Sequence, residues 1–320
     1  MMSEAKTDIS MVCGFCQIEC QRFGKHRNGL RRFRCPNCKK TYTEQHSRTL
    51  GTMYISPEKT ELAIKLLVEG NSIRSTERIS GLDRNTILSL VVKAGERCRS
   101  LLLKKIEGLP VRDVEVDEIW GFVAKKQTHI RKDEMAYGIG DAWCFVAIER
   151  NTKLVLAWHL DKRTGVAAFL EKLRYATAPQ KFQLTTDGWH VYPKNVPVIL
   201  WDRVSYAQLI KVYGKPRQGE QRYSAAEIIS TEAVPVMGNP DPDRICTSHV
   251  ERQNLTIRMG MRRMTRLTNA FSKKWENLEA AYALHFAYYN FCRVHKTLRV
   301  TPAMEQGITD HIWTIAELIA

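Results

Sequence analysis

The chain has 320 residues, of which 44% are hydrophobic and 26% charged, and this composition supports a buried core and about two domains. Its formal net charge of +15 predicts a polyanionic partner, and nucleic acid is the expected class. The N-terminus is too polar for a signal peptide and no apolar stretch is long enough to span a bilayer, so we expect a cytoplasmic protein with no membrane partner.

The basic charge is concentrated in two blocks. Residues 1–110 carry 20 Lys and Arg against 11 Asp and Glu, and residues 252–300 carry 10 against 2. Residues 111–251, between the blocks, are almost balanced at 19 against 18. Two basic blocks around a nearly neutral middle predict two separate contacts with nucleic acid.

Two closely spaced cysteine pairs, "CGFC" and "CPNC", lie in the first basic block. The two-residue gap within each pair lets both thiolates reach one tetrahedral zinc ion, and nine cysteines in a cytoplasmic chain favour metal over disulfides. We therefore expect a zinc ribbon over residues 1–50, with a structural zinc that supplies its folding energy. The expected ligands are Cys13, Cys16, Cys35 and Cys38, and Cys20 lies close enough to compete with them.

Basic side chains on this ribbon are candidates for phosphate contacts. Arg31, Arg32 and Arg34 precede or flank the second cysteine pair. The alternative is that they only solvate a small domain. The basic segment that follows favours contact with DNA.

Residues 51–108 predict a helix-turn-helix DNA-binding domain. A first helix starts with Ser56 as N-cap and Pro57 at its first position. A short helix, a "GLD" turn and a long helix capped by Asp83 follow, and the second helix of such a motif enters the major groove by its first residues. These residues are Arg84, Asn85 and Thr86, of which Arg can recognise guanine and Asn adenine. The alternative is a plain three-helix bundle.

The central part of the chain predicts an α/β domain. "DVEVDEIWGFVA" is expected to be a strand carrying Asp117, and "AWCFVAIERNTKLVLAWHL" a hairpin of two apolar strands. "GVAAFLEKLRYAT" is an amphipathic helix, and "KFQLTTDGWHVY" a strand that ends at Asp187. This order of elements is the opening of a ribonuclease H-like fold, in which the first and fourth strands place two aspartates side by side.

Glu251 is the candidate third acid, at the head of a basic helix. Three carboxylates from separate elements could hold two Mg²⁺ ions, or Mn²⁺, about 4 Å apart at a phosphodiester. Each acid also has an ordinary explanation: Asp117 or the adjacent Glu118 could be a solvated strand charge, Asp187 a turn residue, and Glu251 a helix-end acid. The arginines expected to hold the DNA strand beyond Glu251 are Arg258, Arg262 and Arg263.

The last long segment, "SKKWENLEAAYALHFAYYNFCRVH", predicts a helix capped by Ser272. Leu278, Tyr282, His285 and Phe286 are among its expected core residues.

Taken with these features, the whole chain resembles the insertion-sequence-one-type bacterial transposases, of the Asp-Asp-Glu class. The motifs that carry the resemblance are "CGFC…RRFRCPNCKKTYT", "VDEIWGFV", "LTTDGWHVY", "HVERQNLTIR", "NAFSKK" and "YYNFCRVHKTLRVTPA". The resemblance implies a Mg²⁺-dependent ribonuclease H-like core over residues 109–300, followed by a helical tail over 301–320. It implies recognition of terminal inverted repeats by the N-terminal part, DNA cleavage and strand transfer. Asp117, Asp187 and Glu251 match the catalytic triad.

The expected partners are therefore double-stranded DNA, as transposon ends and as target, and further copies of the chain on that DNA in a bacterial nucleoid. One departure is the long interval between Asp187 and Glu251, which predicts an inserted loop near residues 212–246 and leaves Glu227 and Glu232 as rivals for the third acid. The alternatives are a transposase-derived DNA-binding regulator without catalysis, and a nuclease without strand transfer.

Overall fold

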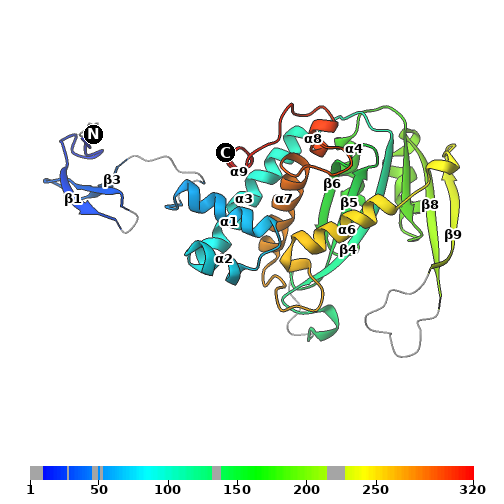
Figure 1. Cartoon of the computed structure of the whole chain (residues 1–320), viewed down its shortest axis with the longest axis horizontal. Helices are drawn as coiled ribbons and strands as arrows, with labels where there is room; N and C mark the ends of the chain where they lie inside the picture. Colours follow the sequence, from blue (N-terminus) through cyan, green and yellow to red (C-terminus); the bar gives the residue numbers. More distant parts are fainter. Residues whose placement is uncertain (1–9, 27–28, 45–49, 51–52, 132–137, 215–227) are drawn as a thin grey trace. The chain divides into compact units, whose positions relative to one another are not determined.

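The computed structural model describes residues 10–26, 29–44, 50, 53–131, 138–214 and 228–320 (Figure 1). The chain divides into two compact units, Met1–Thr60 and Glu61–Ala320. None of the described helices combines the length and the apolar character that crossing a lipid bilayer requires.

The first unit contains a small antiparallel sheet in the order β1-β2-β3. Its strands are β1 (Gln21–Lys25), β2 (Arg31–Arg34) and β3 (Thr41–Thr43). The buried side chains of this unit include Cys13, Cys20, Phe33 and Cys35, with Tyr42 packed against them. Because so few apolar groups are buried, this unit needs a further source of stability beyond its core.

Three helices follow, the first of which spans the boundary between the units, and their ends match the local sequence signals. They are α1 (Pro57–Val68), α2 (Ile73–Ser80) and α3 (Arg84–Lys105). Gly81 ends α2 with a φ of 68°, in the left-handed region that glycine tolerates. Asp83 caps α3, and its carboxylate accepts hydrogen bonds from the backbone N–H groups of Asn85 (2.8 Å) and Thr86 (3.4 Å).

A mixed sheet forms the centre of this unit, with its described strands in the order β6-β5-β4-β7-β8-β9. Its strands are β4 (Asp113–Val123), β5 (Gly140–Glu149), β6 (Val155–Asp161), β7 (Phe182–Asp187), β8 (Val204–Tyr213) and β9 (Ile228–Met237). β7 runs parallel to both β4 and β8, and the remaining pairs are antiparallel. β4 and β7 are central strands and are buried along most of their length, as parallel strands covered on both faces require.

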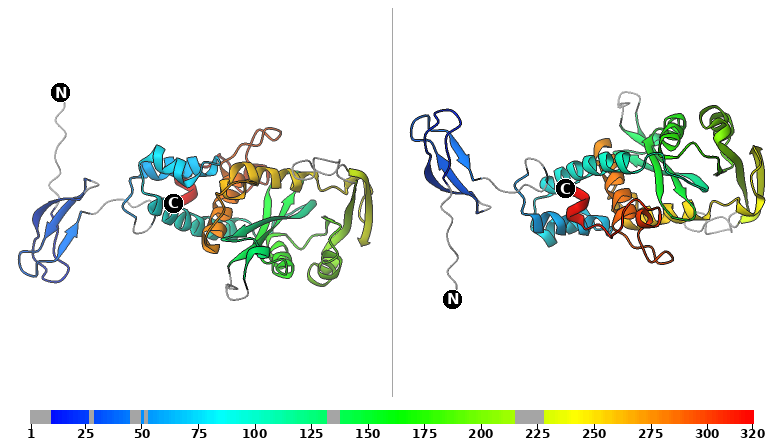
Figure 2. Two further views of the ribbon diagram at one scale, coloured as in Figure 1. Left: turned by 90° about the horizontal axis from the view of Figure 1, so that it is seen from below. Right: turned by 90° about the horizontal axis from the view of Figure 1, so that it is seen from above.

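Helices cover both faces of the sheet (Figure 2). α4 (Val166–Ala176) and α5 (Tyr192–Ile199) lie on one face, where Phe169 stacks on Phe145 with ring centroids 5.7 Å apart. α6 (Ser248–Gly260) and α7 (Trp275–Phe291) lie on the other, where Phe286 packs against Trp158 at 5.6 Å. The chain ends with the short helices α8 (Pro302–Glu305) and α9 (Ile315–Ile319).

α3 and α7 pack closely enough that the contact excludes a side chain at one position. A Cβ atom added to Gly95 would lie 2.4 Å from the carbonyl oxygen of Ala280. This contact joins the N-terminal helices to the part of the chain that covers the sheet.

Two segments differ from their expected structure. α7 starts after Lys274, so Ser272 does not cap it; the Ser272 hydroxyl is buried and instead accepts a hydrogen bond from Nη1 of Arg263 at 2.9 Å. The region expected to be an inserted loop contains β9, which pairs with β8, whereas residues 215–227 lie outside the described part of the chain.

Candidate metal centres and nucleic-acid surface

Asp117 and Asp187 lie side by side on the two central strands. Val116 pairs with Thr186 in the parallel β4–β7 ladder, so the next residue on each strand is one of the two aspartates. Carboxylate oxygens of Asp117, Glu118 and Asp187 lie within 4.8 Å of one another. The register of the sheet thus brings together two acids that are 70 positions apart in the sequence.

The acidic cluster, which we define as Asp117, Glu118 and Asp187, favours protonated carboxyl groups when no cation is bound. Burial, together with the charges of Asp187 and Glu251, raises the pKa of Asp117 to about 7. Burial, with the neighbouring aspartates, raises the pKa of Glu118 to about 8. Among the described residues none forms an ion pair with the cluster. A hard divalent cation would remove the repulsion between the negative carboxylates, and carboxylate oxygens are its preferred ligands.

Glu118 belongs to the site, although from the sequence it could equally have been a solvated strand charge. It faces α5, where the buried hydroxyl of Tyr192 donates a hydrogen bond to its Oε2 at 3.0 Å. The only signal in the sequence is its position next to Asp117.

Glu251 lies in the first turn of α6 and outside the acidic cluster. Its carboxylate accepts a hydrogen bond from the Thr247 hydroxyl at 2.6 Å and forms an ion pair with Lys211 of β8. Its charge nevertheless contributes to the raised pKa values of Asp117 and Asp187. Glu251 therefore lies near the cluster but is paired with a lysine.

The two rivals of Glu251 are not placed with the cluster. Glu232 is exposed on β9 and pairs with Ile210 in the ladder. Glu227 lies outside the described residues.

A buried glutamate fixes the start of α6 against β4. Oε2 of Glu115 accepts hydrogen bonds from the backbone N–H groups of His249 (2.8 Å) and Val250 (3.1 Å). Glu115 is 2% exposed, so its charge is held at the positive end of the helix rather than in water. Because Glu115 and Asp117 are two residues apart on one strand, they face the same side, and Glu251 is thereby held near Asp117.

Asn254, one turn beyond Glu251, reaches the acidic cluster directly. Its Nδ2 donates to Oδ2 of Asp117 at 2.8 Å, whereas its Oδ1 is buried and has no hydrogen-bond partner in the described structure. An unsatisfied buried oxygen beside carboxylates is costly, and a bound cation or its water would satisfy it. The donor set thus fits a divalent ion.

The second candidate metal site is the cysteine group of the first unit. The sulfur atoms of Cys13, Cys16, Cys35 and Cys38 all lie within 4.8 Å of one another. The Sγ atoms of Cys13 and Cys38 are 3.6 Å apart, close to the roughly 3.8 Å that two thiolates of a tetrahedral zinc site adopt. Cys20 is buried in the same small core but does not join the group.

Arginines on the first unit form a basic and aromatic surface. The guanidinium groups of Arg32 and Arg34 lie 5.2 and 5.0 Å from the ring centroid of Phe23, which is 41% exposed. Arg31 differs, because it pairs with Glu44 at 3.8 Å. Stacked guanidinium groups beside an exposed ring suit a nucleic-acid strand.

The predicted DNA-contacting residues of the second unit fall into two groups. Arg84 and Asn85 are exposed at the start of α3, with Thr86 half-buried beside them. Arg258, in contrast, donates to the backbone carbonyls of Met264 (3.1 Å) and Trp120 (3.4 Å), which gives it a local packing role.

The chain matches no protein-family model and no curated protein. Among solved structures it is similar to the cryo-EM structure of a piggyBac transposase synaptic complex with hairpin DNA. The match covers 86% of this chain and 72% of that chain, at 12% identity and a TM-score of 0.37. This similarity is too low to assign a family, so the function is argued from the residues themselves.

Proposed function

We propose that the chain is a DNA transposase that binds the terminal inverted repeats of an insertion sequence and carries out metal-dependent cleavage and strand transfer. The observation that carries the proposal is the acidic cluster, in which Asp117 and Asp187 occupy matching positions on adjacent parallel strands. An enzyme that cleaves phosphodiesters with metal ions requires carboxyl groups that are not already paired with a cationic side chain, so that they can bind the metal.

The topology of the sheet supports a ribonuclease H-like catalytic core. Three antiparallel strands in the order β6-β5-β4 are followed by α4 and then by β7 and β8, which extend the sheet beside β4. We propose residues 109–300 as this core, behind a zinc ribbon (1–50) and a helix-turn-helix (51–108). This strand order matters because it makes β4 and β7 neighbours and so places their aspartates side by side.

Asp117 and Asp187 would hold the Mg²⁺ or Mn²⁺ ions, with Glu251 or Glu118 as the third carboxylate. Such ions, when bound, activate the attacking oxygen and stabilise the leaving one. Asn254 orients the Asp117 carboxylate by its hydrogen bond, and Glu115 holds the helix that carries Asn254 and Glu251. The carboxyl groups must lose their protons to act as ligands, so the raised pKa values predict weaker metal binding below neutral pH.

Lys211 has a specific place in this proposal. It forms an ion pair with Glu251. If Glu251 turned toward a metal, the ammonium group of Lys211 would be released from the carboxylate and could pair with a DNA phosphate instead. Lys211 would therefore pair with Glu251 before DNA binds and with a DNA phosphate afterwards.

The experiment is a cleavage assay on DNA that the protein selects for itself. Duplexes bound from a random pool define the recognised end, and that end is then incubated with protein and Mg²⁺ or Mn²⁺ while nicks and joined products are mapped. Asp187→Asn should abolish both reactions and preserve binding, whereas the exposed Glu276→Gln should change neither. Specific binding without any cleavage by the natural chain would instead support the regulator, and nicks without joined products would support a nuclease.

The third carboxylate is identified in the same assay. We expect Glu251→Gln to abolish cleavage while end binding survives or tightens, because one negative charge near the phosphates is removed. Glu118→Gln should retain measurable cleavage if Glu118 only supports its neighbours. The opposite pattern, with cleavage lost in Glu118→Gln and kept in Glu251→Gln, would assign the third ligand to Glu118.

A further inference from the structure

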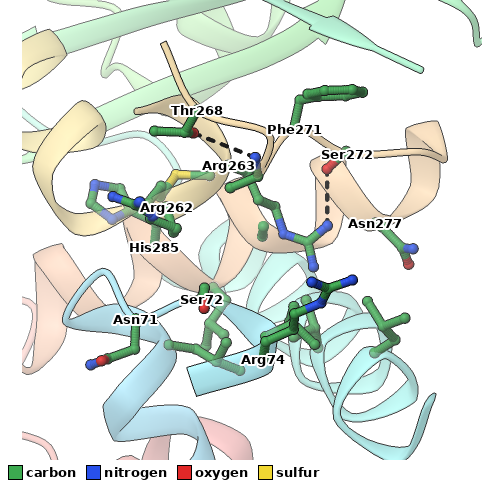
Figure 3. A pocket seen from close by; sticks show the side chains of 18 of the residues that line it. Asn71, Ser72, Arg74, Arg262, Arg263, Thr268, Phe271, Ser272, Asn277 and His285 are labelled. Carbon is green, nitrogen blue, oxygen red and sulfur yellow. Dashed lines mark hydrogen bonds between the residues drawn. The ribbon is translucent and has the colours of Figure 1, made fainter. Parts of the chain in front are cut away.

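A pocket of about 710 Å³ lies in the second unit, away from the acidic cluster. It is bounded by the end of α1, the starts of α2 and α3, the segment 260–273 and α7 (Figure 3). Its lining contains five cationic side chains, and none of the described residues that line it is Asp or Glu. The cations are Arg74, Arg84, Arg262, Arg263 and Lys273. We refer to it as the arginine pocket.

Two of these arginines face each other. Figure 3 shows the guanidinium groups of Arg74 and Arg263 pointing toward one another. Nη1 of Arg263 donates a hydrogen bond to the Ser272 hydroxyl, but Nη2 is buried and has no hydrogen-bond partner in the described structure. Burial lowers the pKa of Arg263 to about 10, which reflects a charge removed from water without a counterion. An anion between the two groups would satisfy both.

His285 supplies a second, independent sign of a missing ligand. It lines the pocket from α7 and is 3% exposed, yet neither of its ring nitrogens has a hydrogen-bond partner in the described structure. A buried imidazole without partners is costly, and both a donor and an acceptor on it are unused. On one side the ring is closed off by Gly260, where an added Cβ would lie 3.1 Å from Cε1.

The rest of the lining combines polar side chains, such as Asn71 and Asn277, with apolar ones. Leu88, Phe271 and Leu284 are among the residues that line the space. A volume of about 710 Å³ is far more than a single phosphate ion fills and lies within the range of small-molecule sites. The ligand therefore combines an anionic group with a larger, partly apolar body that has hydrogen-bonding edges.

We propose that the arginine pocket binds one nucleotide, with its phosphate between Arg74 and Arg263 and its base against the apolar side chains of the lining, toward His285. The nucleotide is either a free nucleoside monophosphate or an unpaired unit of a DNA strand, since both present the same groups. The inference goes beyond the proposed function, because it needs no catalysis at the acidic cluster.

Calorimetric titration of the full chain tests the proposal, with deoxyadenosine monophosphate, inorganic phosphate and a short single-stranded oligonucleotide as probes. Arg74 is exposed, so Arg74→Ala should leave the fold intact, and Arg78→Ala on the same helix is the matched control outside the pocket. We expect Arg74→Ala and Arg263→Met to weaken nucleotide binding by about tenfold or more, as loss of a charge-assisted contact does, and Arg78→Ala to change it by less than about twofold. Asp187→Asn should bind the probes normally, which separates this site from the cleavage proposal.

The probes also decide what the pocket recognises. Tighter binding of the monophosphate than of inorganic phosphate, with this preference reduced in His285→Phe, supports a nucleotide site. Binding of the oligonucleotide alone, still dependent on Arg74, assigns the nucleotide to a DNA strand. Equal affinities of Arg74→Ala and Arg78→Ala for every probe would overturn the proposal, and so would inorganic phosphate binding as tightly as the monophosphate.

Discussion

His285 gives the protein a pH-dependent weakness that can be measured. Burial lowers the pKa of His285 to about 3, and the nearby charge of Arg293 acts in the same direction. The unfolded chain takes up this proton near the ordinary pKa of 6.5, whereas the folded chain does not. Stability is therefore fully present above about pH 7 and is lost as the pH falls through the unfolded value. His285→Phe removes the group and should remove this loss.

The size of the effect follows from the two pKa values. At pH 5 the unfolded state is favoured by about 2 kcal/mol through this one histidine, because the pH lies about 1.5 units below the unfolded pKa and still above the folded one. At pH 8 the contribution is close to zero. The natural chain should therefore lose about 2 kcal/mol more than His285→Phe between these two pH values.

Denaturant unfolding followed by tryptophan fluorescence measures this difference. All seven tryptophans lie between Trp120 and Trp313, so the signal reports on the second unit and is insensitive to loss of zinc from the first. The exposed His129→Phe is the control and should behave like the natural chain. If His285→Phe loses as much stability on acidification as the natural chain, His285 is not buried in its neutral form and the reasoning fails.

Three further predictions concern metal, DNA and packing. Cys35→Ser should reduce the zinc content from one ion per chain to none by elemental analysis, and full zinc retention would refute the ligand set. Asn85→Ala should cost roughly 1–3 kcal/mol of discrimination between selected and random duplexes in binding titrations, whereas Arg32→Ala should weaken both duplexes alike; equal losses for Asn85→Ala would contradict the recognition-helix assignment. Gly95→Val should destabilise the second unit by about 1–3 kcal/mol in the same fluorescence assay, because its side chain would collide with Ala280, and an unchanged midpoint would show that α3 and α7 can separate freely.

The features that local sequence determines were predictable. The structure has a helix over 84–105 with Asp83 as its cap, and strands that carry Asp117 and end at Asp187, as the sequence predicted. The four cysteines were grouped correctly by their spacing. These features depend on capping groups, alternation of apolar residues and short spacers, all of which act over a few positions along the chain.

The composition of the acidic cluster was decided by the tertiary structure. Nothing in the sequence shows that Glu118 would meet the hydroxyl of Tyr192, because the contact requires α5 to pack on that face of β4. The pairing of Glu251 with Lys211 likewise depends on the start of α6 lying near β8, whose Lys211 is 40 positions away in the sequence.

For the basic residues, too, the sequence determined their positions and the tertiary structure determined their environments. Counting arginines after Glu251 predicted one DNA-holding surface, but the fold gives them different environments. Arg258 donates to backbone carbonyls, and Arg263 faces Arg74 with its Nη2 atom buried. Ser272 lies before the start of α7 and accepts a hydrogen bond from Arg263 instead of capping the helix. Sequence alone determined which charges the chain carries and which helices and strands they lie on. Only the packing of α2, α3 and α7 around the segment 260–273 decided which of those charges are removed from water, and burial is what makes an unpaired charge costly enough to indicate a ligand.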